Sequence, residues 1–253
     1  MGFQASIIAI GTLVVQVALN ELGSDAVAAY TAASRVDGLA IALLQSLGLA
    51  VSMFVAQNYG GGRPDRIRVG VTQATWMALI GSVVLGALLV VAGAALVRLF
   101  VGEAAEDVVS LAALMLVING VTYTSLGVLF VLRGALQGLG HTLIPTVTGI
   151  IELVARVAAA IVLGGIMGFA GVAWSNPLAW VGAVVVLIPA YLHAQRALAR
   201  MPIADHISPE TTPIPVVGPT NGSMSVDAVV TRPVPIIPTG RRAPRVLTRI
   251  RRR

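Results

Sequence analysis

Residues 26–57 read AVAAYTAASRVDGLAIALLQSLGLAVSMFVAQ, a long apolar run whose only charged residues are Arg35 and Asp37. The run ends in GGGRPDRIR at residues 60–68, where glycine, proline and three arginines replace the apolar residues. A helix needs about 20 apolar residues to cross the hydrocarbon core of a membrane. This stretch therefore predicts a membrane helix that stops at a polar, basic connection.

The rest of the chain up to about residue 200 repeats this pattern. The 253 residues are 57% hydrophobic and 11% charged, whereas a soluble domain has about 25% charged residues. Met1 is followed by no basic segment of the kind that opens a secretory signal, so we expect a membrane helix at the start of the chain. The sequence predicts an all-α bundle of six transmembrane helices at residues 3–22, 26–57, 67–100, 108–132, 143–167 and 170–194.

The connections between these segments alternate in charge. The second connection carries three arginines, the fourth carries Arg133 and His141, and Arg196 and Arg200 follow the sixth segment. The first and third are mainly acidic, and the fifth is uncharged. Because arginine is retained on the cytoplasmic side, we expect both termini in the cytoplasm and the chain in the plasma membrane, most simply a bacterial inner membrane.

The composition changes after residue 200. Residues 202–253 hold nine of the 13 prolines, and their eight arginines face only three acidic residues. We expect residues 1–200 to form the membrane lobe and residues 201–253 a disordered cytoplasmic tail. The tail either binds anionic lipid head groups or is solvated without a further task. The arginines expected at the lipid surface are Arg241, Arg242, Arg245, Arg249, Arg251, Arg252 and Arg253.

Four charged residues lie inside predicted membrane helices, namely Arg35, Asp37, Glu152 and Arg156. At a rise of about 1.5 Å per residue, Arg35 and Glu152 lie near the middle of the membrane. Glu152 and Arg156 are four residues apart and can pair on one helix face, whereas Arg35 and Asp37 face different ways. The four residues are either a clamp between helices or a protonatable, cation-binding cluster in a cavity.

Uncharged polar residues accompany these charges inside the apolar segments. They either line the same cavity or form hydrogen bonds between helices. The candidates are Gln16, Asn20, Asn119, Tyr123 and Asn176.

No signal of catalysis or of a resident cofactor is present in the sequence. The chain has no cysteine, no histidine deep in a membrane segment and no phosphate-binding glycine loop, so we expect neither an enzyme nor a metal site. The basic tail lacks a folded nucleic-acid module, so we expect no nucleic-acid partner.

Three stretches resemble the MATE (multidrug and toxic compound extrusion) transporters: residues 28–66, VLRGALQGLGHTLIPTVTGIIELVAR at 131–156, and GFAGVAWSNPLAW at 168–180. Such transporters have two similar six-helix lobes around a central cavity, and these motifs are similar to the second lobe. Glu152 and Arg156 match the E-x-x-x-R of the fifth helix. Members that use sodium can carry acidic residues on the first and fourth helices of this lobe, where this chain has Gln16, Asn20 and Asn119.

The resemblance implies half of a proton- or sodium-coupled antiporter that exports small organic, often cationic, compounds by alternating access. One lobe supplies one wall of the cavity, so we expect a first-lobe partner, a homodimer or an inactive partial product. Two other functions stay open. The chain is a membrane scaffold that does not transport, or a flippase for a lipid-linked precursor.

Overall fold

The computed structural model describes residues 2–101 and 106–201, with side chains described from residue 11 onward. Every element in this part of the chain is an α-helix, as the sequence predicts. The predicted tail and its arginines lie outside the described residues. The helices are α1 (Gly2–Glu21), α2 (Ser24–Gly60), α3 (Pro64–Val101), α4 (Glu106–Gly138), α5 (Leu143–Met167), α6 (Phe169–Ala173) and α7 (Ser175–Leu198).

The six predicted membrane segments all fall on these helices. The helices α2, α3, α4, α5 and the α6–α7 pair are long and apolar enough to span a membrane. The sixth segment is divided at Trp174, between α6 and α7. Pro177 has no N–H to donate to the carbonyl of Ala173, so one backbone hydrogen bond is missing at this division.

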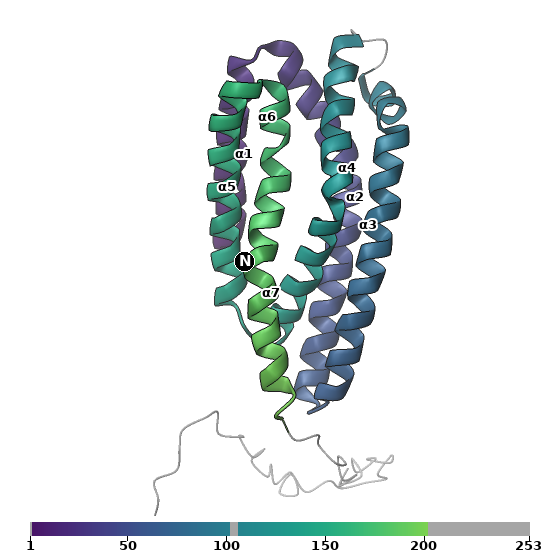
Figure 1. Cartoon of the computed structure of the whole chain (residues 1–253), viewed down its shortest axis with the longest axis vertical. Coiled ribbons are helices and arrows are strands. Elements are labelled where there is room, and N and C mark those ends of the chain that lie inside the picture. Colours follow the sequence, from purple (N-terminus) through teal and green to yellow (C-terminus); the bar gives the residue numbers. More distant parts are fainter. Residues whose placement is uncertain (1, 102–105, 202–253) are drawn as a thin grey trace, which may run out of the picture. The chain divides into compact units, whose positions relative to one another are not determined.

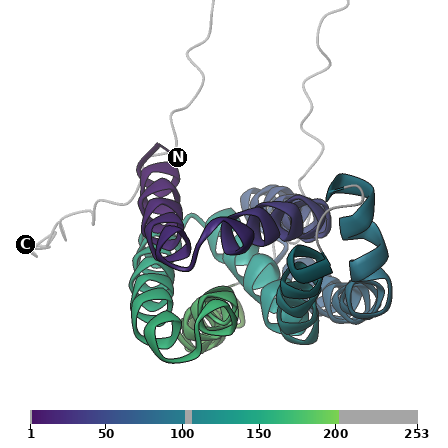
Figure 2. The same ribbon diagram turned by 90° about the horizontal axis from the view of Figure 1, so that it is seen from above.

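The helices form two groups that lie side by side in Figures 1 and 2. In one group α4 packs against α2 and α3, and in the other α5 packs against α1, α6 and α7. The two groups meet mainly where α4 contacts α7. The helix α4 is the most buried of the spanning helices, because it has neighbours from both groups.

Glycine allows α4 to approach its neighbours closely. A Cβ on Gly120 would lie 2.8 Å from the carbonyl oxygen of Gly86 in α3, and a Cβ on Gly48 of α2 would lie 2.8 Å from that of Phe130 in α4. Real Cβ atoms are not found at such distances from backbone. These contacts are typical of membrane helices, which associate through small residues because lipid supplies no hydrophobic drive between them.

The connections alternate between the two ends of the bundle. Figure 1 shows α1–α2, α3–α4 and α5–α6 joined at one end, and α2–α3 and α4–α5 joined at the other, where α7 also ends. We call the second the basic end, and it carries Arg63, Arg66, Arg68, Arg196 and Arg200. We call the first the acidic end, and it carries Glu21, Asp25, Glu106 and Asp107 beside Arg98.

Candidate functional site

The Asp37 carboxylate is held by neutral donors from a neighbouring helix. Asp37 is 3% exposed, and its Oδ2 accepts a hydrogen bond of 3.0 Å from Nδ2 of Asn119. Its Oδ1 accepts a second hydrogen bond from the hydroxyl of Tyr123. Asn119 and Tyr123 lie on one face of α4 because they are four residues apart. Among the described residues, no cation pairs with Asp37.

A third helix fixes the orientation of Tyr123. The ring of Trp180 in α7 meets the ring of Tyr123 edge to face, with centroids 5.9 Å apart and planes at 70°. Both residues are buried where α4 contacts α7. The carboxylate of α2 is therefore bound by a donor pair on α4 whose position depends on α7.

Glu152 pairs with Arg133 of α4 rather than forming its ion pair within its own helix. The guanidinium of Arg133 contacts Oε1 of Glu152, and each side chain is 16% exposed. The helices α4 and α5 follow each other through a short connection, so residues on either side of it lie at similar depth. Arg156 remains close enough to act on Glu152 through its charge. One carboxylate thus lies among two guanidinium groups.

Arg156 is half-buried on α5. Its guanidinium lies beside α1, where a Cβ on Gly11 would be 3.8 Å away, an ordinary van der Waals distance. Its buried Nε has no hydrogen-bond partner within the described part of the chain. The Nε of Arg133 is also buried and also has no hydrogen-bond partner among the described residues.

Tyr30 of α2 lies between the two charged sites. Its hydroxyl lies near the side chains of Asn176 and Ser34, and near enough to Arg156 and Asp37 for their charges to act on it. The charged and polar groups therefore follow one another through the bundle, and we call this series the polar seam. Its members are Arg133, Glu152, Arg156, Tyr30, Asn176, Asp37, Asn119 and Tyr123.

The structure places three of the candidate residues away from the seam. Arg35 is exposed on the outside of α2 and makes no ion pair with a described residue. Gln16 donates a hydrogen bond of 3.3 Å to Asn20 on the same helix, and neither forms a described hydrogen bond with the seam. The seam therefore brings together six of the nine candidate membrane residues.

Sequence reasoning missed Arg133, Tyr30 and Trp180 as members of the site. Arg133 was assigned to a connection because a charge ended the apolar segment, but α4 continues to Gly138. Tyr30 and Trp180 look like ordinary apolar neighbours in the sequence. The available signal for Arg133 was its place in the last turns of one helix, with Glu152 on the helix that follows after a short connection.

The chemistry of the seam follows from its charges. Asp37 and Glu152 balance Arg133 and Arg156 overall, but the negative charge of Asp37 lies apart from the surplus guanidinium at Glu152. A carboxylate that accepts only neutral donors can take up a proton or a small cation, whereas Glu152 is already compensated. In residues 11–101 and 106–201, no three histidine or acidic side chains gather to hold a metal ion.

Comparison with known proteins gives a consistent family. The model of the MatE family matches residues 1–162. The chain is 30% identical over 135 residues to the probable multidrug resistance protein YoeA of Bacillus subtilis, a match that covers 53% of this chain and 29% of that protein. It is also 30% identical over 124 residues to the probable multidrug resistance protein NorM of Pasteurella multocida, covering 49% and 26%.

Solved structures share the fold. A MOP superfamily transporter from Pyrococcus furiosus matches with a TM-score of 0.71 and 19% identity, over 77% of this chain and 43% of that one. A MATE protein in a bent conformation matches with the same TM-score and 17% identity, over 78% and 44%. The chain thus spans under half the length of these relatives.

Proposed function

Because the chain belongs to the MatE family, whose members are transporters and not enzymes, we propose that residues 1–200 form the second six-helix lobe of a multidrug efflux antiporter. The antiporter exports small organic, often cationic, compounds in exchange for protons or sodium ions that move down their own gradient. The resemblance of residues 131–156 to the second lobe supports this assignment, as does coverage of 43–44% of two solved transporters by one bundle.

The observation that carries the proposal is the state of Asp37. It is a buried carboxylate inside a membrane helix, bound by an amide and a phenol and lacking a described cation. Ionisable residues in such positions are costly and mark ion pathways in many membrane proteins. Asp37 is the coupling residue, Asn119 and Tyr123 orient it, and the remaining seam residues extend the polar path through the bundle.

Alternating access requires a second body. The substrate cavity forms between this lobe and a first lobe, or between two copies of this chain, and the two bodies rock against each other. The exposed apolar side chains on the outside of the bundle are available for lipid and for this second lobe.

The test uses proteoliposomes that contain the full chain and a six-helix first lobe. A proton or sodium gradient should drive efflux of ethidium, a cationic dye, and Asp37→Asn should abolish it. Asp25→Asn is the matched control, because it makes the same change at the exposed end of the same helix. The proposal fails if no gradient drives dye efflux, or if both variants transport equally.

A specific observation favours a second function, the flipping of a lipid-linked precursor. The Arg133–Glu152–Arg156 group has two guanidiniums for one carboxylate, and such an excess suits an anionic phosphate. The Pyrococcus relative is described as having a binding pocket of reversed polarity. This function would be favoured if a fluorescent lipid pyrophosphate moves from one leaflet to the other in vesicles that contain this chain, without any dye efflux.

A deletion of the tail, compared with a change at the coupling carboxylate, tests the scaffold alternative. If the chain only anchors a partner through its tail, deleting residues 202–253 abolishes the cellular phenotype and Asp37→Asn leaves it intact. For the antiporter the expected outcome is the reverse.

The proposed orientation places the basic end in the cytoplasm of a bacterium, with both termini there and the tail arginines against anionic lipid. The chain contains no cysteine, so single-cysteine variants report cleanly. Arg66→Cys and Glu106→Cys should react with an impermeant maleimide from opposite sides of the membrane. Reaction of both from the same side would overturn this topology.

A further inference from the structure

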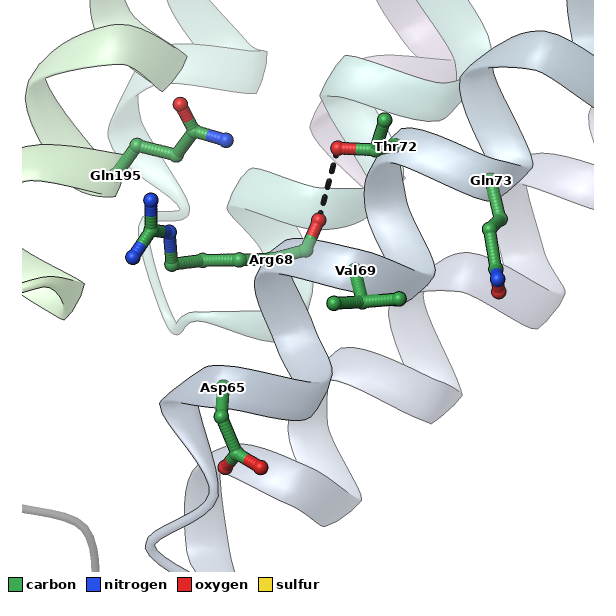
Figure 3. Close-up of a pocket in the computed structure, with 6 residues that line it drawn as sticks. All are labelled: Asp65, Arg68, Val69, Thr72, Gln73 and Gln195. Atoms are coloured by element: carbon green, nitrogen blue, oxygen red, sulfur yellow. Dashed lines mark hydrogen bonds between the residues drawn. The ribbon is translucent and has the colours of Figure 1, made fainter.

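An open hollow of about 500 Å³ lies between α3 and α7 at the basic end (Figure 3). Its walls carry a guanidinium that forms no ion pair with a described residue, together with amide and hydroxyl groups. The residues that line it are Asp65, Arg68, Val69, Thr72, Gln73 and Gln195.

Arg68 is the charge of this hollow. Its backbone carbonyl accepts a hydrogen bond of 2.9 Å from the Thr72 hydroxyl, but its guanidinium forms no ion pair with a described residue. In Figure 3 the guanidinium extends from α3 toward Gln195 on α7. The two side chains thus present donors to the same space from opposite helices.

Asp65 does not neutralise Arg68, because it is already paired. Arg63 donates two hydrogen bonds to its carboxylate, at 3.2 and 3.0 Å. Gln195 donates at 3.3 Å to the Tyr191 hydroxyl, which leaves its second N–H and its carbonyl for other partners. The hollow therefore keeps a net positive charge.

The position along α3 shows which part of a membrane faces the hollow. Val69, Trp76 and Met77 continue from it toward the bundle centre and are 58%, 63% and 62% exposed. On the other side lie the remaining arginines of the basic end. The hollow thus lies where an apolar surface meets a charged one, the level at which lipid head groups are found.

We propose that this hollow binds the phosphate group of an anionic phospholipid, with Arg68 as its ion-pair partner and Gln195 as a further hydrogen-bond donor. The acyl chains lie along the apolar surface of α3. Basic pockets between membrane helices bind such head groups in other proteins. The apolar surface favours a lipid over a free phosphate, which would gain nothing from it. This site is independent of the proposed transport.

The test measures lipid retained by the full chain in detergent, by native mass spectrometry with phosphatidylglycerol or phosphatidylcholine. We expect preferential retention of phosphatidylglycerol, with Arg68→Gln lowering its affinity about fivefold, the effect of about 1 kcal/mol per arginine. Arg66→Gln is the matched control, because it removes the same charge two residues away and outside the hollow. The tail is present in both variants, so its own attraction to anionic lipid cancels.

A second variant adds a charge instead of removing one. Gln195→Glu places a carboxylate opposite Arg68 and should lower phosphatidylglycerol retention to a similar degree. The proposal is overturned if Arg66→Gln and Arg68→Gln have equal effects, which would indicate general surface attraction. It is also overturned if 10 mM inorganic phosphate displaces the lipid as well as added lipid does, which would indicate a site for phosphate alone. Loss of dye transport in these variants would not bear on either outcome.

Discussion

The two carboxylates of the polar seam have opposite surroundings. Asp37 accepts hydrogen bonds only from an amide and a phenol, whereas Glu152 contacts one guanidinium and lies near another. The difference separates two tasks that a buried acid can have in a membrane. A carboxylate with charged partners holds helices together, and one with neutral partners is free to exchange a proton or cation.

The largest effect on stability is expected at Glu152. The variant Glu152→Gln leaves Arg133 and Arg156 in the bundle without their carboxylate, and removing one partner of a buried pair costs about 3–5 kcal/mol. We expect a large drop in the melting temperature of the detergent-solubilised chain. The melting temperature is measured by size-exclusion chromatography of samples heated to a series of temperatures.

The double variant Arg133→Gln with Glu152→Gln is the control for this prediction. It removes the cation together with the carboxylate, so it should recover a large part of the lost stability. If Glu152→Gln melts within 1 °C of the unchanged chain, the pair contributes nothing and the clamp assignment is wrong.

A smaller effect is expected at Tyr123. The change Tyr123→Phe keeps the ring that packs edge to face on Trp180 but removes the hydroxyl that donates to Asp37. Hydrogen bonds between membrane helices contribute about 1–2 kcal/mol, so a moderate drop in melting temperature should follow. Trp180→Phe is the companion variant, since it disturbs the orienting ring and leaves the hydroxyl. Equal stability of Tyr123→Phe and the unchanged chain would show that the phenol is not a significant ligand of Asp37.

The variant Asp37→Asn should alter stability less than Glu152→Gln or Tyr123→Phe does. In Asp37→Asn the amide oxygen still accepts from Tyr123, and a flipped Asn119 amide can accept from the new Nδ2 through its Oδ1, which has no described partner now. No charge needs to be buried, so the melting temperature should shift by the equivalent of about 1 kcal/mol or less. A drop as large as that of Glu152→Gln would contradict the contrast drawn between the two carboxylates.

The helices were predictable because apolar run length is a local property. The bundle, its six segments and the resemblance at residues 131–156 followed from the sequence, and the MatE match supports the family. Partners across helices were less accessible. Spacing along one helix suggested that Glu152 pairs with Arg156. The observed ion pair with Arg133 depends on how α5 is rotated relative to α4. Counting residues gives depth, but it does not give the direction in which a side chain points.

Arg35 is a residue whose side-chain direction could not be predicted from the sequence. Its substitution should have the smallest effect on stability. Counting places it near the middle of the membrane, yet in the structure Arg35 is exposed while Asp37 faces α4. Because Arg35 has no described partner, Arg35→Gln breaks no described contact and should change stability by about 0.5 kcal/mol or less, as is usual for surface positions. The measurement is the same melting experiment, run with and without the first lobe. If Arg35→Gln alters the melting temperature only when the first lobe is present, Arg35 lies in the interface between the lobes. A large loss of stability in the isolated chain would instead show that Arg35 has a partner within this bundle and, like Glu152, holds helices together.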